Sequence, residues 1–209
     1  FFPQWAELIF KPIENPPELL DGLIPRNSFK IMFAGNIGEA QDFPAILKAA
    51  QLLKHKKNLQ WIIIGDGRRA EWVQDKINEY GLKDCFQLLG SFPLETMPEF
   101  YANADAMLLS LKEEHIFSIT IPAKVQSYLA CGKPILAMIN GEAADIIKRS
   151  KCGIVVNAED YKAFADEIIK ISKTSGLYLD EMKQNGFAYY EKTFNKKMVI
   201  DSFLKSVSN

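Results

Sequence analysis

The sequence lacks a surplus of either charge and lacks any long hydrophobic run. Its 209 residues carry 25 basic and 26 acidic side chains, which gives a net charge of −1. A nearly neutral chain has no general attraction to nucleic acid or to an anionic surface, so any bound anion has to be held locally. No apolar stretch approaches the roughly 20 residues needed to cross a bilayer, and no basic leader opens the chain. We expect a cytoplasmic globular protein without a nucleic-acid partner.

Cysteine is also scarce. The three residues Cys85, Cys131 and Cys152 are odd in number, widely spaced and set in apolar surroundings. A disulfide framework needs pairs, and a metal cluster needs close spacing. We therefore expect reduced thiols in the core, and no metal site.

The opening segment lacks both an initial Met and a periodic pattern. It begins at Phe1, and residues 1–28 contain five prolines. Such a composition is typical of a linker, so we expect residues 1–28 to be an interdomain entry segment of a longer protein.

From Phe29 onward, apolar strand-like runs alternate with helix-like segments. The expected strands lie at 29–35, 59–65, 85–90, 105–110, 133–138 and 152–156. Short buried strands separated by helices predict a Rossmann-like, doubly wound parallel sheet of about six strands, with helices on both faces. Residues 29–176 would form this α/β domain. Residues 177–209 would form a helical C-terminal tail, with Gly176 and Gly186 as breaks.

Two helix starts are well marked. Asp42 can cap a helix whose opening turn contains Pro44, followed by an apolar stripe at Ile46, Leu47, Ala50 and Leu53. A second helix begins near Pro122 and ends at Gly132, where a left-handed residue is expected.

In a parallel sheet of this kind, ligands bind at the carboxyl ends of the strands. The first two strands both end in glycine-containing loops, with Gly35, Asn36 and Gly38 after the first and Gly65 and Gly67 after the second. Glycine lets backbone approach a phosphate, although a tight turn explains the same pattern. The loops do not spell GxGxxG, and the second strand does not end in an acidic residue, which argues against an NAD site.

Arg68 and Arg69 stand at the start of the second helix. A positive charge there opposes the helix dipole, so a bound anion would explain the pair. Surface ion pairs with Glu71 or Asp75 are the alternative explanation.

The loop after the fourth strand is the longest strand-to-helix connection, and it contains Glu114 and His115. Long loops in compact domains tend to be functional, although an exposed loop histidine is common. Gly141 and Glu142 open the helix after the fifth strand.

The order of FAGNIG, IIIGDG, LLGSFPLETMPEFYANADAMLLSL, IPAKVQSYLACGKPIL and GEAADIIKRSKCGIVV resembles one enzyme family. It is similar to the C-terminal half of GT-B-fold retaining glycosyltransferases of family 4, glycosyl transferases group 1. Within that family it resembles the bacterial branch that builds capsule, O-antigen and exopolysaccharide. The resemblance covers residues 29 to about 194.

The resemblance implies a role for this chain. It would bind a nucleotide-diphosphate sugar, most often a UDP-sugar, without a metal or other cofactor. An N-terminal domain would bind an acceptor glycan or lipid-linked saccharide, and the whole protein would lie in the cytoplasm, in some cases at the inner membrane. The transferred group would be a hexosyl or N-acetylhexosaminyl unit, and this piece alone would be inactive.

The resemblance also implies site residues. Arg69 and Lys124 would stabilise the leaving diphosphate, because EAQDF stands where the family usually has a lysine. The nucleotide sugar would contact Gly35, Asn36, Gly38, Gly65, Gly67, Arg68, Ser127, Gly141 and Glu142, with Glu114 and His115 as weaker candidates. Ser127 stands where the family usually has a ribose-binding glutamate, and Ile119 where it has a second acid. Three apolar residues of the tail would be exposed where the N-terminal domain packs: Tyr189, Tyr190 and Phe194.

Two other functions fit the same pattern. A sugar-nucleotide epimerase of GT-B fold would make the same donor contacts but would change the donor without an acceptor. A degenerate, non-catalytic nucleotide-binding module would explain the missing acids. A dinucleotide oxidoreductase is disfavoured by the absent fingerprint.

Overall fold

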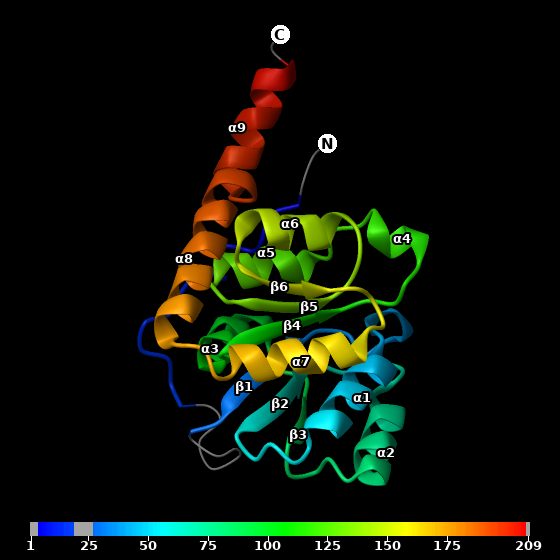
Figure 1. Cartoon of the computed structure of the whole chain (residues 1–209). Helices are drawn as coiled ribbons and strands as arrows, with labels where there is room; N and C mark the ends of the chain where they lie inside the picture. The colour runs from blue at the N-terminus through cyan, green and yellow to red at the C-terminus, as the bar shows by residue number, and fades with distance from the viewer. Residues whose placement is uncertain (1–3, 19–26, 208–209) are drawn as a thin grey trace.

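The structure, a computed structural model, describes residues 4–18 and 27–207. Within these ranges, six parallel strands form one sheet in the order β3-β2-β1-β4-β5-β6 (Figure 1). The strands are β1 (Phe29–Ala34), β2 (Leu59–Ile64), β3 (Phe86–Gly90), β4 (Ala106–Ser110), β5 (Ile135–Met138) and β6 (Gly153–Val156). The strand order reverses between β1 and β4, and the loops that leave these strands diverge at this point.

Helices cover both faces of the sheet, which confirms the predicted doubly wound fold. One core lies under α1 (Phe43–Leu53), α2 (Ala70–Tyr80) and α7 (Tyr161–Ile171). The other lies under α3 (Met97–Asn103), α5 (Ala123–Ala130), α6 (Glu142–Ser150) and α8 (Gly176–Thr193). The remaining elements are the 3₁₀ turns η1 (Glu39–Gln41) and η2 (Leu94–Thr96), the short α4 (His115–Ser118) and the C-terminal α9 (Lys196–Val207).

The start of α1 follows the sequence prediction. Asp42 caps the helix from a left-handed conformation, with φ 48°, and its Oδ1 accepts a hydrogen bond from the Ala45 amide at 3.3 Å. Pro44 lies in the first turn, where a missing N–H costs nothing. The predicted stripe is buried in full, at Ile46, Leu47, Ala50 and Leu53.

Two expectations for the C-terminal tail are wrong, and the first is the helix break at Gly186. Gly176 does begin a helix, but Gly186 lies inside α8 and does not break it. A Cβ at Gly186 would lie 3.0 Å from Cys152 Cβ and 3.3 Å from Leu129 Cδ2, so the missing side chain lets α8 approach its neighbours closely.

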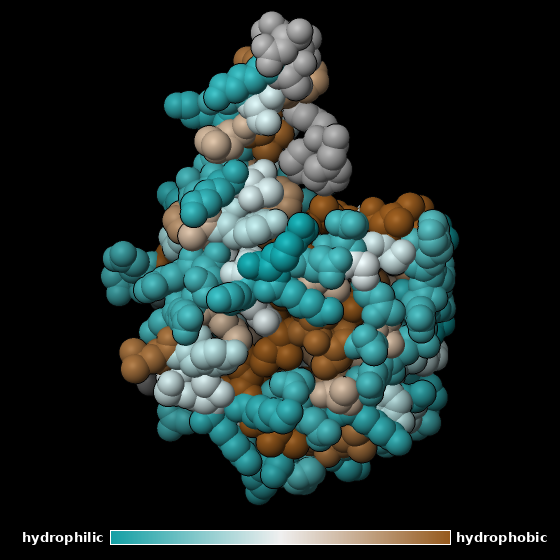
Figure 2. Space-filling model, turned by 45° about the horizontal axis from the view of Figure 1, so that its top comes forward, coloured by the Kyte–Doolittle hydropathy of each residue, from teal (hydrophilic) through white to brown (hydrophobic). Residues whose placement is uncertain are grey.

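The exposed apolar residues of the tail are also not those predicted. Tyr190 and Phe194 are buried, and Tyr189 is half-buried, because the second half of α8 packs onto the core. The helix α9 instead protrudes from the body (Figure 1). Its surface is partly hydrophilic and partly hydrophobic (Figure 2). The exposed apolar side chains of α8 and α9 are Leu177, Tyr178, Met198, Ile200, Phe203 and Leu204.

The described part of the entry segment packs against the domain. Ala6 and Phe10 are buried, and the Phe10 ring stacks on Tyr101 with centroids 5.6 Å apart. Residues 1–3, 19–26 and 208–209 of the predicted segments lie outside the described ranges. The predicted core thiols are confirmed, since Cys85, Cys131 and Cys152 are buried and free.

The described residues contain neither a membrane-spanning helix nor a cluster of metal-binding side chains. In residues 4–18 and 27–207, no helix is both long and apolar enough to span a membrane. Across the same part of the chain, no group of three or more His, Cys, Asp or Glu side chains is arranged to hold a metal ion.

Candidate functional site

The glycine loops after β1 and β2 touch each other at the carboxyl edge of the sheet. Gly35 and Gly65 have φ values of 135° and 133°. A Cβ at Gly65 would lie only 1.9 Å from the Gly35 carbonyl oxygen, and the Gly35 amide donates to the Ile64 carbonyl at 2.9 Å. Glycine is therefore required at Gly65 because the two backbones meet.

The next glycines hold the same two loops in place. A Cβ at Gly67 would lie 2.5 Å from both Asn36 Oδ1 and the Ile37 carbonyl oxygen. Gln41 Oε1 accepts a hydrogen bond from the Gly38 amide at 3.0 Å, and Asp66 Oδ1 accepts one from the Gly67 amide at 2.7 Å. These contacts order the loops before any ligand arrives.

Lys124 reaches this edge from the first turn of α5. Its Nζ lies 3.8 Å from the centroid of the Phe33 ring, and a Cβ at Gly35 would lie 3.2 Å from the same nitrogen. The next turn of the helix is tied to β1, since the Ala34 amide donates to the Tyr128 hydroxyl at 3.3 Å. Burial lowers the pKa of Lys124 to about 7, because the charged form loses hydration.

Ser127 lies one turn further along α5 and is buried. Its Oγ donates to the Lys124 carbonyl at 3.0 Å. Burial raises the pKa of the neighbouring Tyr101 hydroxyl, and a hydrogen bond with Ser127 partly opposes that rise.

Two adjoining pockets are lined by five of the thirteen predicted site residues: Gly35, Asn36, Gly65, Lys124 and Ser127. The larger, about 610 Å³, lies between the entry segment and the ends of β1 and α5. The smaller, about 350 Å³, opens over the β1 and β2 loops. Both are lined by Ala34, Gly35, Leu94 and Tyr101; the larger adds Lys124 and Ser127, and the smaller adds Asn36, Gly65, Asp66 and Phe92.

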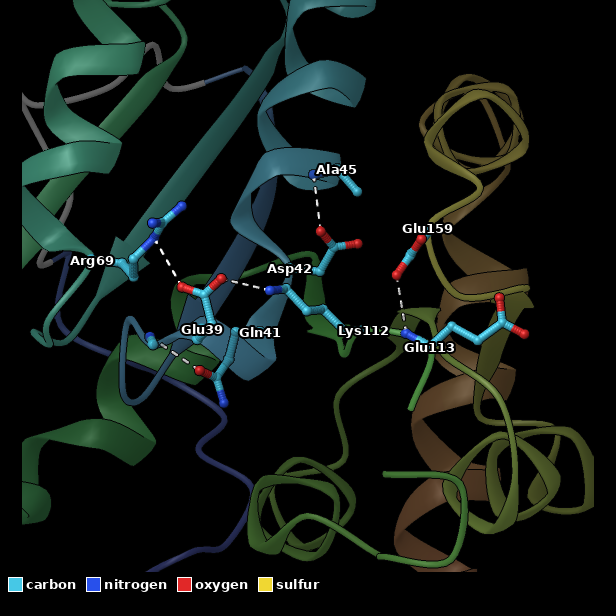
Figure 3. A network of polar contacts seen from close by, with 9 residues as sticks. Glu39, Gln41, Asp42, Ala45, Arg69, Lys112, Glu113 and Glu159 are labelled. Carbon is cyan, nitrogen blue, oxygen red and sulfur yellow. Dashed lines mark hydrogen bonds and ion pairs between the residues drawn. The ribbon is translucent and has the colours of Figure 1, made fainter. Parts of the chain in front are cut away.

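Arg69 is held by a carboxylate that the sequence prediction did not choose (Figure 3). Its Nε lies 3.4 Å from Glu39 Oε2, and its guanidinium lies 4.1 Å from the centroid of the Trp72 ring. Lys112 Nζ approaches the other oxygen of Glu39 at 2.6 Å. The hydrogen bond from Lys112, and then the charge of Arg69, lower the pKa of Glu39. The adjacent Arg68 is exposed.

Lys112 was missed from the sequence. It follows β4 by two residues and so lies at the ligand-binding edge, a position that could have signalled it. Its amide also donates to the Ala40 carbonyl at 3.0 Å, which ties the β4 loop to the β1 loop.

A separate hollow of about 210 Å³ shares no lining residue with the two pockets above. Glu114 and His115 line it and are exposed. Gly141, with φ 81°, packs against this region, since a Cβ there would lie 1.9 Å from the Ser118 carbonyl oxygen. Glu142 begins α6 and is exposed. None of these four residues lines the pocket that contains Lys124.

The chain is similar to known proteins over most of its length. Residues 20–189 match the family model described as glycosyl transferases group 1. The probable glycosyltransferase WbjE of Pseudomonas aeruginosa is 32% identical over 204 residues, covering 90% of this chain and 49% of that protein. The putative colanic acid biosynthesis glycosyl transferase WcaI of Escherichia coli K12 is 25% identical over 219 residues, covering 99% of this chain and 51% of that protein.

A solved structure has the same fold. The crystal structure of Anabaena HepE in complex with UDP and glucose superposes with a TM-score of 0.78 at 17% identity, covering 99% of this chain and 55% of that chain. This chain thus spans about half the length of the curated relatives WbjE and WcaI.

Proposed function

Because the chain belongs to the glycosyl transferases group 1 family, we propose that it is the donor-binding half of a retaining glycosyltransferase. Its ligand is the nucleotide diphosphate of a sugar donor, with UDP as the nucleotide. The observation that carries the proposal is the position of Lys124 Nζ, in the pocket beside Gly35 at the carboxyl end of β1.

The chemistry follows from the charge that develops during transfer. As the bond between the anomeric carbon and the phosphate oxygen breaks, negative charge grows on the leaving diphosphate. Lys124 supplies a positive charge there, and the N-terminus of α5 adds unsatisfied backbone N–H groups. Arg69 assists from the β2 loop once Glu39 gives up its ion pair. The proposed chemistry uses no metal.

The nucleotide occupies the two adjoining pockets. The diphosphate lies by Gly35, Gly65 and Lys124, and the ribose lies near Ser127. Asn36, Gly38, Gly67 and Arg68 shape the phosphate side. Gly141, Glu142, Glu114 and His115 lie towards the hollow beside α4 and would meet the sugar only if the donor extends that far.

The whole protein would have a second domain that binds the acceptor, a glycan or lipid-linked saccharide, at the inner face of the membrane. Residues 1–28 would lead from that domain, and residues 177–209 would partly return to it. The exposed apolar side chains of α9 support this contact. Relatives such as WcaI support a role in bacterial surface polysaccharide synthesis, with transfer of a hexosyl or N-acetylhexosaminyl unit.

Titration of the 209-residue chain with UDP, GDP and a UDP-sugar, followed by calorimetry and thermal shift, tests the proposal. We expect weak binding of UDP and no sugar transfer by this chain alone. Absence of heat and of stabilisation at millimolar UDP and GDP would contradict the donor site. Turnover by the isolated chain, or epimerisation of the donor without an acceptor, would contradict the assigned role.

A further inference from the structure

A further pocket, of about 380 Å³, lies at the opposite edge of the sheet from the donor site, and we call it the α8 pocket. Two of its lining residues, Ala102 and Lys133, come shortly before β4 and β5 begin. Because β4 and β5 are parallel, both starts lie at the same edge of the sheet. The described residues that line the α8 pocket all differ from those of the donor pockets and of the hollow beside α4. A ligand there would not compete with a nucleotide for the same side chains.

Three segments far apart in the sequence meet at this pocket. Gly132, with φ 59°, turns the chain between α5 and β5. A Cβ there would lie 3.6 Å from the Lys183 carbonyl oxygen, 3.8 Å from Phe187 Cβ and 3.9 Å from Pro12 Cγ. The turn, α8 and the entry segment are therefore in contact, and Figure 1 shows the entry segment, in dark blue, passing beside α8. The walls of the pocket are in place before a ligand arrives.

Lys133 is the buried cation of the α8 pocket. It is 8% exposed, and its Nζ donates to the carbonyls of Ala102 at 3.0 Å and Ala104 at 2.7 Å. Among the described residues these two carbonyls are its acceptors, whereas an ammonium group has three protons. Capping the end of α3 explains two of the hydrogen bonds. The third proton is left for an acceptor bound in the pocket.

The charges around Lys133 favour an anion as that acceptor. Lys11 and Lys183 also line the pocket, and among its described lining residues Glu14 is the one acidic side chain. Lys183 pairs with Asp180 at 2.7 Å, but Asp180 is exposed and does not line the pocket. Burial, and then the charge of Lys183, lower the pKa of Lys133 to about 8. A bound anion would offset both effects.

The other lining residues narrow the class of anion. Five apolar side chains line the same pocket: Pro12, Ile13, Pro16, Pro98 and Phe187. A bare inorganic ion would leave these side chains uncovered, whereas an ion attached to an apolar group would cover them as well. The volume of about 380 Å³ is within the usual range for small-molecule sites.

We propose that the α8 pocket binds a small phosphate monoester that carries an apolar group. Lys133 donates its third proton to a phosphate oxygen, Lys11 and Lys183 add positive charge around it, and the apolar group lies on the prolines and Phe187. This site is separate from the donor pockets, so the inference does not rest on the proposed function.

The test is calorimetric titration of the 209-residue chain with phenyl phosphate, inorganic phosphate and phenol. The starting chain carries Lys124→Ala, which removes the ammonium group of the donor pocket. We expect phenyl phosphate to bind at least about threefold more tightly than inorganic phosphate, because its ring buries apolar surface. Phenol, which lacks the anion, should give no measurable heat.

Variants of this chain show whether Lys133 holds the phosphate. Lys133→Met keeps an apolar stem without the ammonium group and should weaken phenyl phosphate binding at least about tenfold, as for loss of a charged hydrogen bond. Lys183→Met, at a half-buried position, should weaken it about two- to fivefold, and it tests the site even if Lys133→Met does not fold. Lys173→Met removes an exposed ammonium group outside the pocket and is the matched control. Melting temperatures show which variants fold.

Several outcomes would overturn the inference. If Lys133→Met and Lys183→Met bind phenyl phosphate as tightly as Lys173→Met does, the α8 pocket does not hold it. If wild type binds phenyl phosphate and Lys124→Ala does not, the phosphate belongs to the donor site. Binding to vesicles of phosphatidic acid without binding of phenyl phosphate would assign the pocket to a lipid headgroup and contradict a small ligand. Absence of heat with millimolar phenyl phosphate in every chain would contradict the site itself.

Discussion

Lys124 Nζ lies 3.8 Å from the centroid of the Phe33 ring, at the point where β1 meets α5. The ring face attracts the ammonium group, but it stabilises the charge far less than water does. Burial therefore lowers the pKa of Lys124 to about 7. A bound anion would favour the charged form, so protonation of Lys124 and binding of a diphosphate are linked.

This linkage predicts that UDP binding weakens as pH rises. Below pH 7 the Lys124 amine is mostly protonated. Above pH 7 it is mostly neutral, so binding of UDP requires the amine to take up a proton. Between pH 7 and pH 8.5 the affinity should fall about tenfold, with proton uptake measured by calorimetry in buffers of different ionisation enthalpy.

Lys124→Arg is the control for this pH effect. Arginine stays charged throughout the range, so its profile should be flat. Among the described residues, Glu7 and Tyr101 are the other titratable side chains that line the pocket. An equally steep fall in Lys124→Arg would assign the effect to a group other than the lysine.

Glu39 neutralises charge beside the β1 loop, because it holds both Arg69 and Lys112. Glu39→Gln should raise UDP affinity about two- to fivefold, the range expected from one exposed charge pair. The gain should shrink at high salt, because screening acts on exposed charges. Titrations at low and high sodium chloride measure it, and unchanged or weaker binding at low salt would contradict this role.

Gly65→Ala tests the contact between the two glycine loops. The new Cβ would lie 1.9 Å from the Gly35 carbonyl oxygen at a φ of 133°, so the loops have to separate. We expect a loss of about 1–3 kcal/mol in the free energy of unfolding, together with weaker UDP binding. Gly176→Ala, with open space around the added Cβ, should leave both unchanged. Equal stability of the two variants in urea denaturation would contradict the close contact.

Asp42 combines a helix cap with a buried carboxylate oxygen, Oδ2, that has no hydrogen-bond partner among the described residues. Asp42→Ala should lower the free energy of unfolding by about 1 kcal/mol, because the helix loses its cap. Asp42→Asn keeps the acceptor for the Ala45 amide and tolerates the left-handed backbone, so at neutral pH it should remain within about 0.5 kcal/mol of wild type.

The difference in stability between wild type and Asp42→Asn should change with pH in one direction. Burial raises the pKa of Asp42 above 3.8, so the folded state binds a proton more readily than the unfolded state. Wild type should therefore gain stability relative to Asp42→Asn as pH falls through the raised pKa. Urea denaturation between pH 4 and pH 7 measures this difference, and the opposite slope would contradict the assignment.

The strands and most helix starts could be predicted because their signals are local. Buried apolar runs mark the strands, and Asp42 with Pro44 marks the start of α1. Gly186 was misread for the same reason. A glycine that breaks a helix and one that admits a neighbouring helix look alike in sequence, and only the contacts with Leu129 and Cys152 separate them.

The candidate site was predicted in part. Two of its glycines, Gly35 and Gly65, directly follow β1 and β2. The first turns of α5, between β4 and β5, contain Lys124 and Ser127. In a parallel sheet these positions lie at the same carboxyl edge, which is why the four residues could be predicted to meet. The partner of Arg69 could not be predicted, since Glu39 lies 30 positions earlier and meets it only across two loops. Tyr101 was likewise missed, because nothing in the sequence indicates that a tyrosine of α3 lines both pockets.

Titration of wild type and Lys124→Ala with UDP and with uridine tests the central claim most directly. If Lys124 meets the diphosphate, Lys124→Ala should weaken UDP binding at least about tenfold, as for loss of a charged hydrogen bond, and leave uridine binding nearly unchanged. Equal loss for both ligands, or no loss for either, would contradict the placement of the diphosphate at Lys124.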